Sequence, residues 1–186
     1  AIFSDDGTTL GGIIENEGSG NAGEGGVCAE GMDVVFLVDY TGSMNGAING
    51  VKTGISNLVS AIDTESGGNY RLALVLYDEV NGSSPAYAAS WYYQNLPSNQ
   101  KINTPSPDQS GYNMFFTCVE KMSTVGNSTS FTNNLNAIDG INSDEEMKLG
   151  SGSDADEPAG RSTYEIVAND FAGSFRSGVQ RLIILI

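Results

Sequence analysis

Three oxygen-bearing side chains follow a short apolar run at alternate positions. The run "VVFLV" (34–38) leads directly into Asp39, and Thr41 and Ser43 come next in a stretch that contains a glycine. In a turn, one carboxylate and two hydroxyls at this spacing can face a common point and bind Mg²⁺ or Mn²⁺, with water completing the shell. In the alternative interpretation, Thr41 and Ser43 cap a helix that begins here, while Asp39 accepts backbone N–H bonds.

The elements that must position these residues are short continuous apolar runs. They cover 34–38, 72–77 and 182–186, and they show no alternation of polar and apolar residues. Such runs are typical of strands covered on both faces. We therefore predict an α/β protein with a doubly wound, mostly parallel sheet flanked by helices. Ligands of such sheets bind at the carboxyl ends of the strands, and Asp39 lies at such an end.

Helices are predicted from apolar residues spaced three and four apart. The first helical stripe consists of Ile48, Val51, Ile55, Leu58 and Ile62. A second, within 162–175, consists of Tyr164, Val167, Ala168 and Phe171, and a weaker candidate covers 131–141. A strand, a helix and a strand therefore follow one another from 34 to 77.

The remaining regions differ in composition. Residues 1–31 are rich in Gly and acidic residues and predict an arm or linker. Residues 81–130 form a Tyr-rich insertion in which 86–96 is expected to be an edge strand and the rest a long loop. Residues 32–186 then form one domain.

Composition argues against several classes of function. The net charge of −15, from 23 acidic against 8 basic residues, disfavours nucleic acid and anionic membrane surfaces and favours cations or basic partners. No apolar run approaches the roughly 18 residues of a membrane span, so membrane insertion is not expected. The chain has no histidine, which removes Ser-His-Asp and His-zinc chemistry. With no GxxxxGK loop either, we do not expect an enzyme.

The two cysteines leave two alternatives. Cys28 and Cys118 form a disulfide if the protein works in an oxidising compartment, or they remain separate thiols. A bridge would close a loop of about 90 residues and stabilise the fold by on the order of 4 kcal/mol in the chain-entropy model.

The stretch "DVVFLVDYTGSM" (33–44) resembles the first strand and metal motif of the von Willebrand factor A (VWA) family. That motif, the metal-ion-dependent adhesion site, has the pattern Asp-x-Ser/Thr-x-Ser, here Asp39, Thr41 and Ser43. The stretches 67–79 and 180–186 are similar to further strands of the family. The resemblance implies a VWA, Rossmann-like fold that holds Mg²⁺ or Mn²⁺.

The resemblance also implies ligands from other loops. One comes from the loop before the last helix, where the branch resembling integrin β subunits has a glutamate; Glu157 is the candidate, Asp156 the second choice and Thr163 the third. Pro158 follows Glu157 instead of preceding it, a departure from that branch. Alternatively, this acidic loop is solvated or holds a separate, weak Ca²⁺ site.

The family pattern places another aspartate directly after the strand at 180–186, followed by the last third of the domain. Neither falls within the 186 residues. We therefore expect a partial VWA domain that is not independently stable as residues 1–186.

The function implied by this resemblance is metal-dependent protein binding or adhesion, in which the cation coordinates an acidic group of a partner. The alternative is a structural or assembly protein of a surface filament or virus particle, with the metal optional. An intracellular VWA subunit that works with an ATPase, such as a metal chelatase, is the third hypothesis. The first two place the protein outside the cell, at its surface or in a virus particle.

Overall fold

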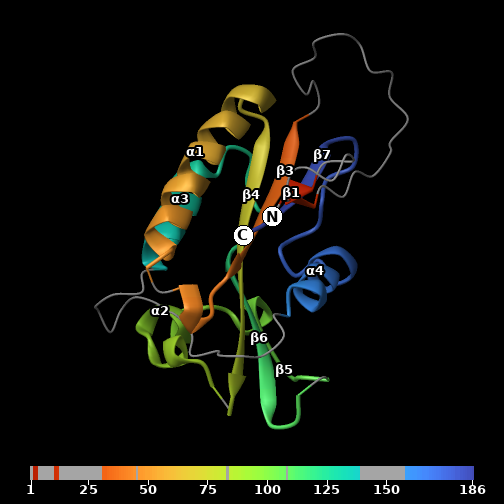
Figure 1. The fold of residues 1–186 in the computed structure, drawn as a ribbon. Coiled ribbons are helices and arrows are strands. Elements are labelled where there is room, and N and C mark those ends of the chain that lie inside the picture. The colour runs from red at the N-terminus through yellow and green to blue at the C-terminus, as the bar shows by residue number, and fades with distance from the viewer. Residues whose placement is uncertain are drawn as a thin grey trace.

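A computed structural model describes residues 2–3, 11–12, 31–44, 46–82, 84–107, 109–138 and 158–186. The fold is α/β, with a mixed five-stranded sheet flanked by helices (Figure 1). Two short segments of the expected arm, β1 (Ile2–Phe3) and β2 (Gly11–Gly12), pair in parallel as a separate two-stranded sheet, and β2 contacts β7 (Gln180–Leu185) of the larger sheet.

The centre of the sheet is formed by the three predicted apolar runs. They are β3 (Met32–Asp39), β4 (Tyr70–Asn81) and β7 (Gln180–Leu185), and β3 pairs in parallel with both others. The register aligns Met32 with Tyr70 and Asp39 with Tyr77, so β3 faces β4 along its whole length. The prediction of these three strands is confirmed.

The other half of the sheet is antiparallel. β6 (Tyr112–Glu120) pairs with β4, and β5 (Lys101–Pro105) pairs with β6, which gives the order β5-β6-β4-β3-β7. The prediction of a mostly parallel sheet is therefore wrong, since half of the pairings in the described sheet are antiparallel. A parallel β6 would have needed a crossover over one face of the sheet, and the segment between β4 and β6 provides none.

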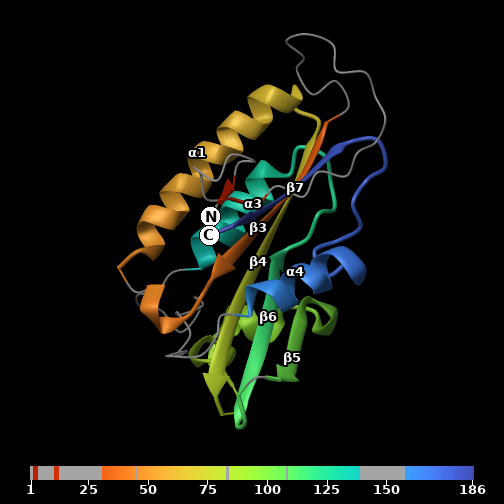
Figure 2. The ribbon, with the colours of Figure 1, turned by 45° about the vertical axis from the view of Figure 1, so that its right-hand side comes forward.

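The helices cover both faces of the sheet (Figures 1 and 2). α1 (Ile48–Ser66) and α3 (Ser128–Ala137) lie side by side on one face, and α4 (Ala159–Ala168) lies on the other. α1 ends at Gly67, whose positive φ of 59° lets the chain turn and satisfy the last carbonyls of the helix. The predicted helices at 48–62 and 131–141 are confirmed within a few residues.

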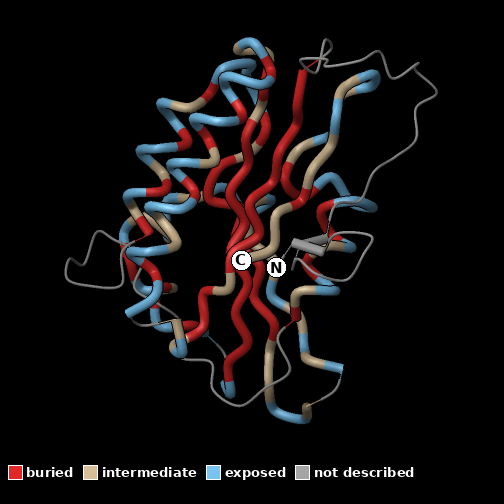
Figure 3. Tube along the Cα trace, turned by 45° about the horizontal axis from the view of Figure 1, so that its top comes forward, coloured by how far each residue is buried: buried red, intermediate tan, exposed pale blue. Residues whose placement is uncertain are grey.

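The core consists of two apolar clusters, one on each face of the sheet. Figure 3 shows that the central strands are buried along most of their length. Along β3, Val34, Phe36 and Val38 pack toward α1 and α3, while Val35 and Leu37 pack toward α4. This double burial explains why β3 has no polar alternation. None of the described helices is long and apolar enough to cross a membrane.

The prediction of an edge strand at 86–96 is wrong. This segment forms a 3-10 turn, η2 (Ala86–Ala89), and a short helix, α2 (Trp91–Asn95), followed by η3 (Ser98–Gln100). The Ser90 hydroxyl accepts a hydrogen bond from the Tyr93 backbone N–H at 3.2 Å and so caps α2. The expectation that the rest of 81–130 is a long loop is wrong as well, because β5 and β6 lie there and belong to the sheet, with β5 at its edge.

The predicted buried stripe of the last helix is also wrong. Tyr164 and Val167 are more than half exposed, whereas Ser162, Glu165 and Ile166 face the sheet. The helix ends at Ala168, and Asp170 has a positive φ of 52°, so Phe171 reaches the core through a turn. Because the chain leaves the helix there, Phe171 does not define the buried face of α4.

Candidate metal centre

The carboxyl end of β3 is where the chain leaves the sheet. The Asp39 backbone N–H donates to the Ile186 carbonyl at 2.8 Å, and the Tyr40 N–H donates to the Tyr77 carbonyl at 2.9 Å. These bonds hold both sides of β3 up to its last residue. The side chain of Asp39 is therefore anchored on rigid backbone at the edge of the sheet.

The three predicted ligands lie together at this edge. Asp39 Oδ1 accepts hydrogen bonds from the Thr41 backbone N–H at 2.8 Å and from Thr41 Oγ1 at 2.7 Å. Thr41 Oγ1 and Ser43 Oγ are 2.9 Å apart. The chain that follows β3 thus brings one carboxylate and two hydroxyls to one point.

The alternative that Thr41 and Ser43 cap the helix is wrong for α1, although Asp39 does accept a backbone N–H bond, as that alternative expected. That helix begins at Ile48, its N-cap residue is Ala47, and no side chain caps it. Thr41 and Ser43 lie before it, with Ser43 inside a separate 3-10 turn, η1 (Gly42–Met44). Apart from the local bonds to Asp39, the two hydroxyls are therefore not used by the helix.

The donor set fits a small divalent cation. Two ligands at right angles, each about 2.1 Å from Mg²⁺, are roughly 3 Å apart, close to the two oxygen separations at this edge. Thr41 is buried, Asp39 is half-buried and Ser43 is exposed, so the group opens to solvent on one side. A cation here would keep positions for water or for a further ligand.

A second carboxylate lies near this edge and was missed by the sequence prediction. Glu79 of β4 is two residues beyond Tyr77, the register partner of Asp39, and both carboxylates point to the α4 face. Strand spacing puts the two Cα atoms roughly 8 Å apart. The signal was present in "YDEV" (77–80), where two acids continue an apolar strand.

Glu79 is only 2% exposed, and its Oε1 has no hydrogen-bond partner in the described part of the chain. A buried carboxylate oxygen without a partner is costly, and a cation or an ordered water would satisfy it. This oxygen is therefore available to a water or a cation at the carboxyl edge.

The other predicted ligands are not brought to this point by the described residues. Glu157 and Asp156 lie outside the described residues. Thr163 lies within α4, where its hydroxyl donates to the Ala159 carbonyl at 2.9 Å. Among the residues that the structure describes, no three His, Cys, Asp or Glu side chains form a metal cluster, so the centre depends on its hydroxyls.

The disulfide is not formed at Cys118. Its thiol is free and fully buried on the α4 face of the sheet, and it donates to the Glu120 carbonyl at 3.3 Å. Burial raises the pKa of this thiol to about 12, so it stays protonated and unreactive. Cys28 lies outside the described residues. The alternative of separate thiols is the one that this geometry favours.

Comparison with known proteins gives no match to a family model, a curated protein or a solved structure. The resemblance to the VWA family stays a prediction that rests on the motif and its neighbouring strands.

Proposed function

We propose that the protein is a metal-dependent binding or adhesion module of the VWA type. The observation that carries this proposal is the convergence of Asp39, Thr41 and Ser43 at the carboxyl end of β3, with oxygen separations of 2.7 and 2.9 Å. The parallel β3-α1-β4 unit and β7 beside β3 support it, because they provide the edge at which such a site is built.

The proposed chemistry is recognition of an acidic group. A divalent cation bound here would supply an electrophilic centre with an open coordination position. Asp39 would supply the charge, Thr41 and Ser43 neutral oxygens, and Glu79 a carboxylate from the neighbouring strand. Because Thr41 and Ser43 supply neutral oxygens and part of the shell stays open, an acidic side chain of a partner protein could complete the coordination.

An assembly role is the second candidate, and β7 favours it. Leu182 and Ile184 pack on one face of this strand and Ile183 and Leu185 on the other, yet in the described sheet β7 pairs only with β3. A strand from another subunit could pair with such an edge. In that case the VWA scaffold serves a surface filament or virus particle, and the metal is optional.

Calorimetry with Mg²⁺ and Mn²⁺ tests the first proposal. Asp39→Ala should abolish saturable binding, because two hydroxyls alone do not offset dehydration of the ion. Asp63→Ala, which removes an exposed carboxylate from α1, should leave binding unchanged. Equal affinities in the wild type and in Asp39→Ala would refute the site. Self-association that persists in EDTA would favour the assembly role.

A further inference from the structure

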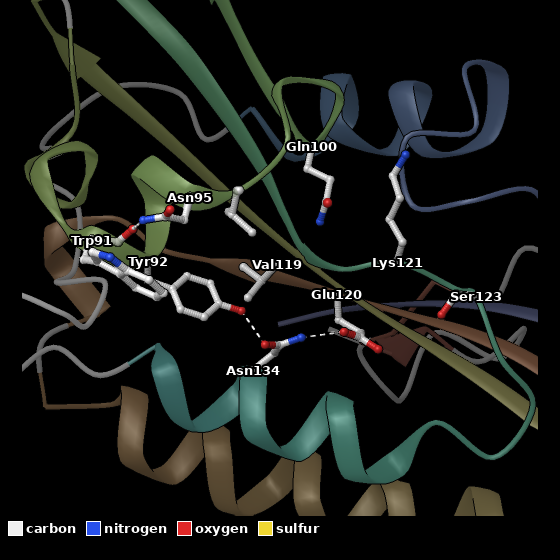
Figure 4. A pocket seen from close by; sticks show the side chains of 10 residues that line it. Trp91, Tyr92, Asn95, Gln100, Val119, Glu120, Lys121, Ser123 and Asn134 are labelled. Atoms are coloured by element: carbon white, nitrogen blue, oxygen red, sulfur yellow. Dashed lines mark hydrogen bonds between the residues drawn. The ribbon is translucent and has the colours of Figure 1, made fainter.

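A cavity of about 430 Å³ lies between α2, η3, β6 and α3 (Figure 4). This volume is within the range of small-molecule sites. Val119, in its floor, packs with the core beneath α1 and α3, whereas the Asp39 side chain points to the opposite face of the sheet. The cavity is therefore separate from the candidate metal centre.

One end of the cavity is aromatic. Trp91 and Tyr92, both on α2, lie there in Figure 4. Trp91 is 62% exposed, although its neighbours Tyr92 and Tyr93 pack against the core. A tryptophan held this far out of the core offers a flat apolar surface on which a ligand can stack.

Amide side chains line the cavity in fixed orientations. The Asn95 amide donates to the Trp91 carbonyl at 2.8 Å, and the Gln100 amide donates to the Cys118 carbonyl at 2.6 Å. The side-chain oxygens of Asn95 and Gln100 accept no hydrogen bond from any described residue. Two oriented acceptors therefore line the cavity, Asn95 beside the aromatic end and Gln100 nearer to Lys121 (Figure 4).

The opposite end offers donors. Lys121 and Ser123 lie there in Figure 4, and neither side chain has a hydrogen bond or ion pair within the described residues. Between the two ends, Glu120 is held by Asn127 at 3.0 Å, Ser130 at 2.6 Å and Asn134 at 2.5 Å. The tyrosine hydroxyl of Tyr92 donates to the other end of the Asn134 amide. Glu120 thus serves mainly to hold α3 against β6, and these two elements form one wall of the cavity.

This lining matches a ring with an apolar C–H face and a rim of hydroxyls. We propose that the cavity binds a saccharide, stacked on Trp91, whose hydroxyls donate to Asn95 and Gln100 and accept from Lys121. A phosphate ligand fits poorly, because the chain carries −15 and the lining has one lysine. Among the described residues that line the cavity, Glu120 is the one carboxylate, and its oxygens are held by α3, so the proposal is binding of a saccharide.

The test uses Trp91 as its own reporter, because the chain contains a single tryptophan. A printed glycan array should show binding to a subset of oligosaccharides. Titration with cellohexaose, chitohexaose, maltohexaose and the array's positive glycans should change the tryptophan fluorescence saturably. By calorimetry, Trp91→Ala should weaken binding at least tenfold, and Trp91→Tyr should restore part of it.

Matched variants separate the site from its surroundings. Tyr164→Ala, which removes another exposed aromatic ring on α4 across the sheet, should leave glycan affinity unchanged, as should EDTA. Asn95→Ala should weaken binding while the cooperative unfolding transition stays intact. An array without any positive glycan, or binding that survives Trp91→Ala, would overturn the proposal.

Discussion

Two aspartates lie at opposite ends of β3 on the same face of the sheet, and their surroundings differ completely. Asp33 is fully buried and accepts hydrogen bonds from Arg71 Nε at 3.0 Å, Arg176 N at 2.7 Å and Arg176 Nε at 2.8 Å, with Arg71 Nη2 also paired to it. Asp39 is half-buried, and its described side-chain hydrogen bonds come from Thr41 alone.

The difference separates a structural carboxylate from an available one. Burial alone would raise the pKa of Asp33, but the bonds from Arg71 and Arg176 outweigh it and lower the pKa below its ordinary value of 3.8. Every oxygen of Asp33 is thereby occupied. Asp39 Oδ2 has no partner among the described residues, and the side chain faces neutral hydroxyls. Asp39 can therefore bind a cation, whereas Asp33 cannot.

The largest expected effect is at the amino end of β3. Asp33→Ala should lower the free energy of unfolding by about 3–5 kcal/mol, because it leaves two arginines without their shared partner. Urea unfolding followed by circular dichroism measures this. Asp63→Ala on α1 is the control and should stay within about 0.5 kcal/mol of the wild type. An unchanged urea midpoint in Asp33→Ala would show that the ion pairs contribute nothing net.

Lowering the pH should reduce the free energy of unfolding of the wild type by part of the amount that Asp33→Ala removes. Because the folded pKa of Asp33 is lowered, its contribution is fully present above the ordinary value of 3.8 and is lost as the pH falls through the folded value. Thermal unfolding of the wild type across this window should therefore show a steeper loss of stability than that of Asp33→Asn. Parallel curves for the two proteins would contradict the assignment of a lowered pKa.

At the carboxyl end, Mg²⁺ at a hundredfold excess over its dissociation constant should stabilise the wild type by about 2.7 kcal/mol. Asp39→Asn should remove this gain, yet change the stability of the metal-free protein by less than about 1 kcal/mol. Differential scanning fluorimetry with and without Mg²⁺ measures both quantities. A large loss in metal-free Asp39→Asn would make Asp39 structural, like Asp33.

The smallest effect should come from Glu79→Gln. This variant keeps the side chain's size and removes its charge, so Mg²⁺ affinity should fall by up to about tenfold, or 1.4 kcal/mol. Calorimetry measures the affinity, and Glu65→Gln on the exposed side of α1 is the matched control. An unaltered affinity would exclude Glu79 from the metal centre, and a water molecule would then be expected to satisfy its buried oxygen.

Local sequence patterns were sufficient to predict the central strands and the first helix of this protein. The apolar runs of β3 and β4 and the stripe of α1 predict their elements because each element buries its own residues in a regular period. The contact among Asp39, Thr41 and Ser43 could be predicted for a similar reason. Residues of one turn lie close together independently of the tertiary fold.

Tertiary structure decided what depends on distant partners. β6 is antiparallel because of the path the chain takes after β4, and α4 turns Ile166 inward because the chain leaves the helix before Phe171. Glu79 comes near Asp39 only through the register of two strands. Asp33, Arg71 and Arg176 come from three separate segments of the chain. Their contact cannot be predicted from the residue spacing within any one segment. Sequence by itself thus determined the three central strands, α1, α3 and the turn motif, where the interactions are short-range. The fold determined the antiparallel half of the sheet, the buried face of α4 and which charges became buried partners.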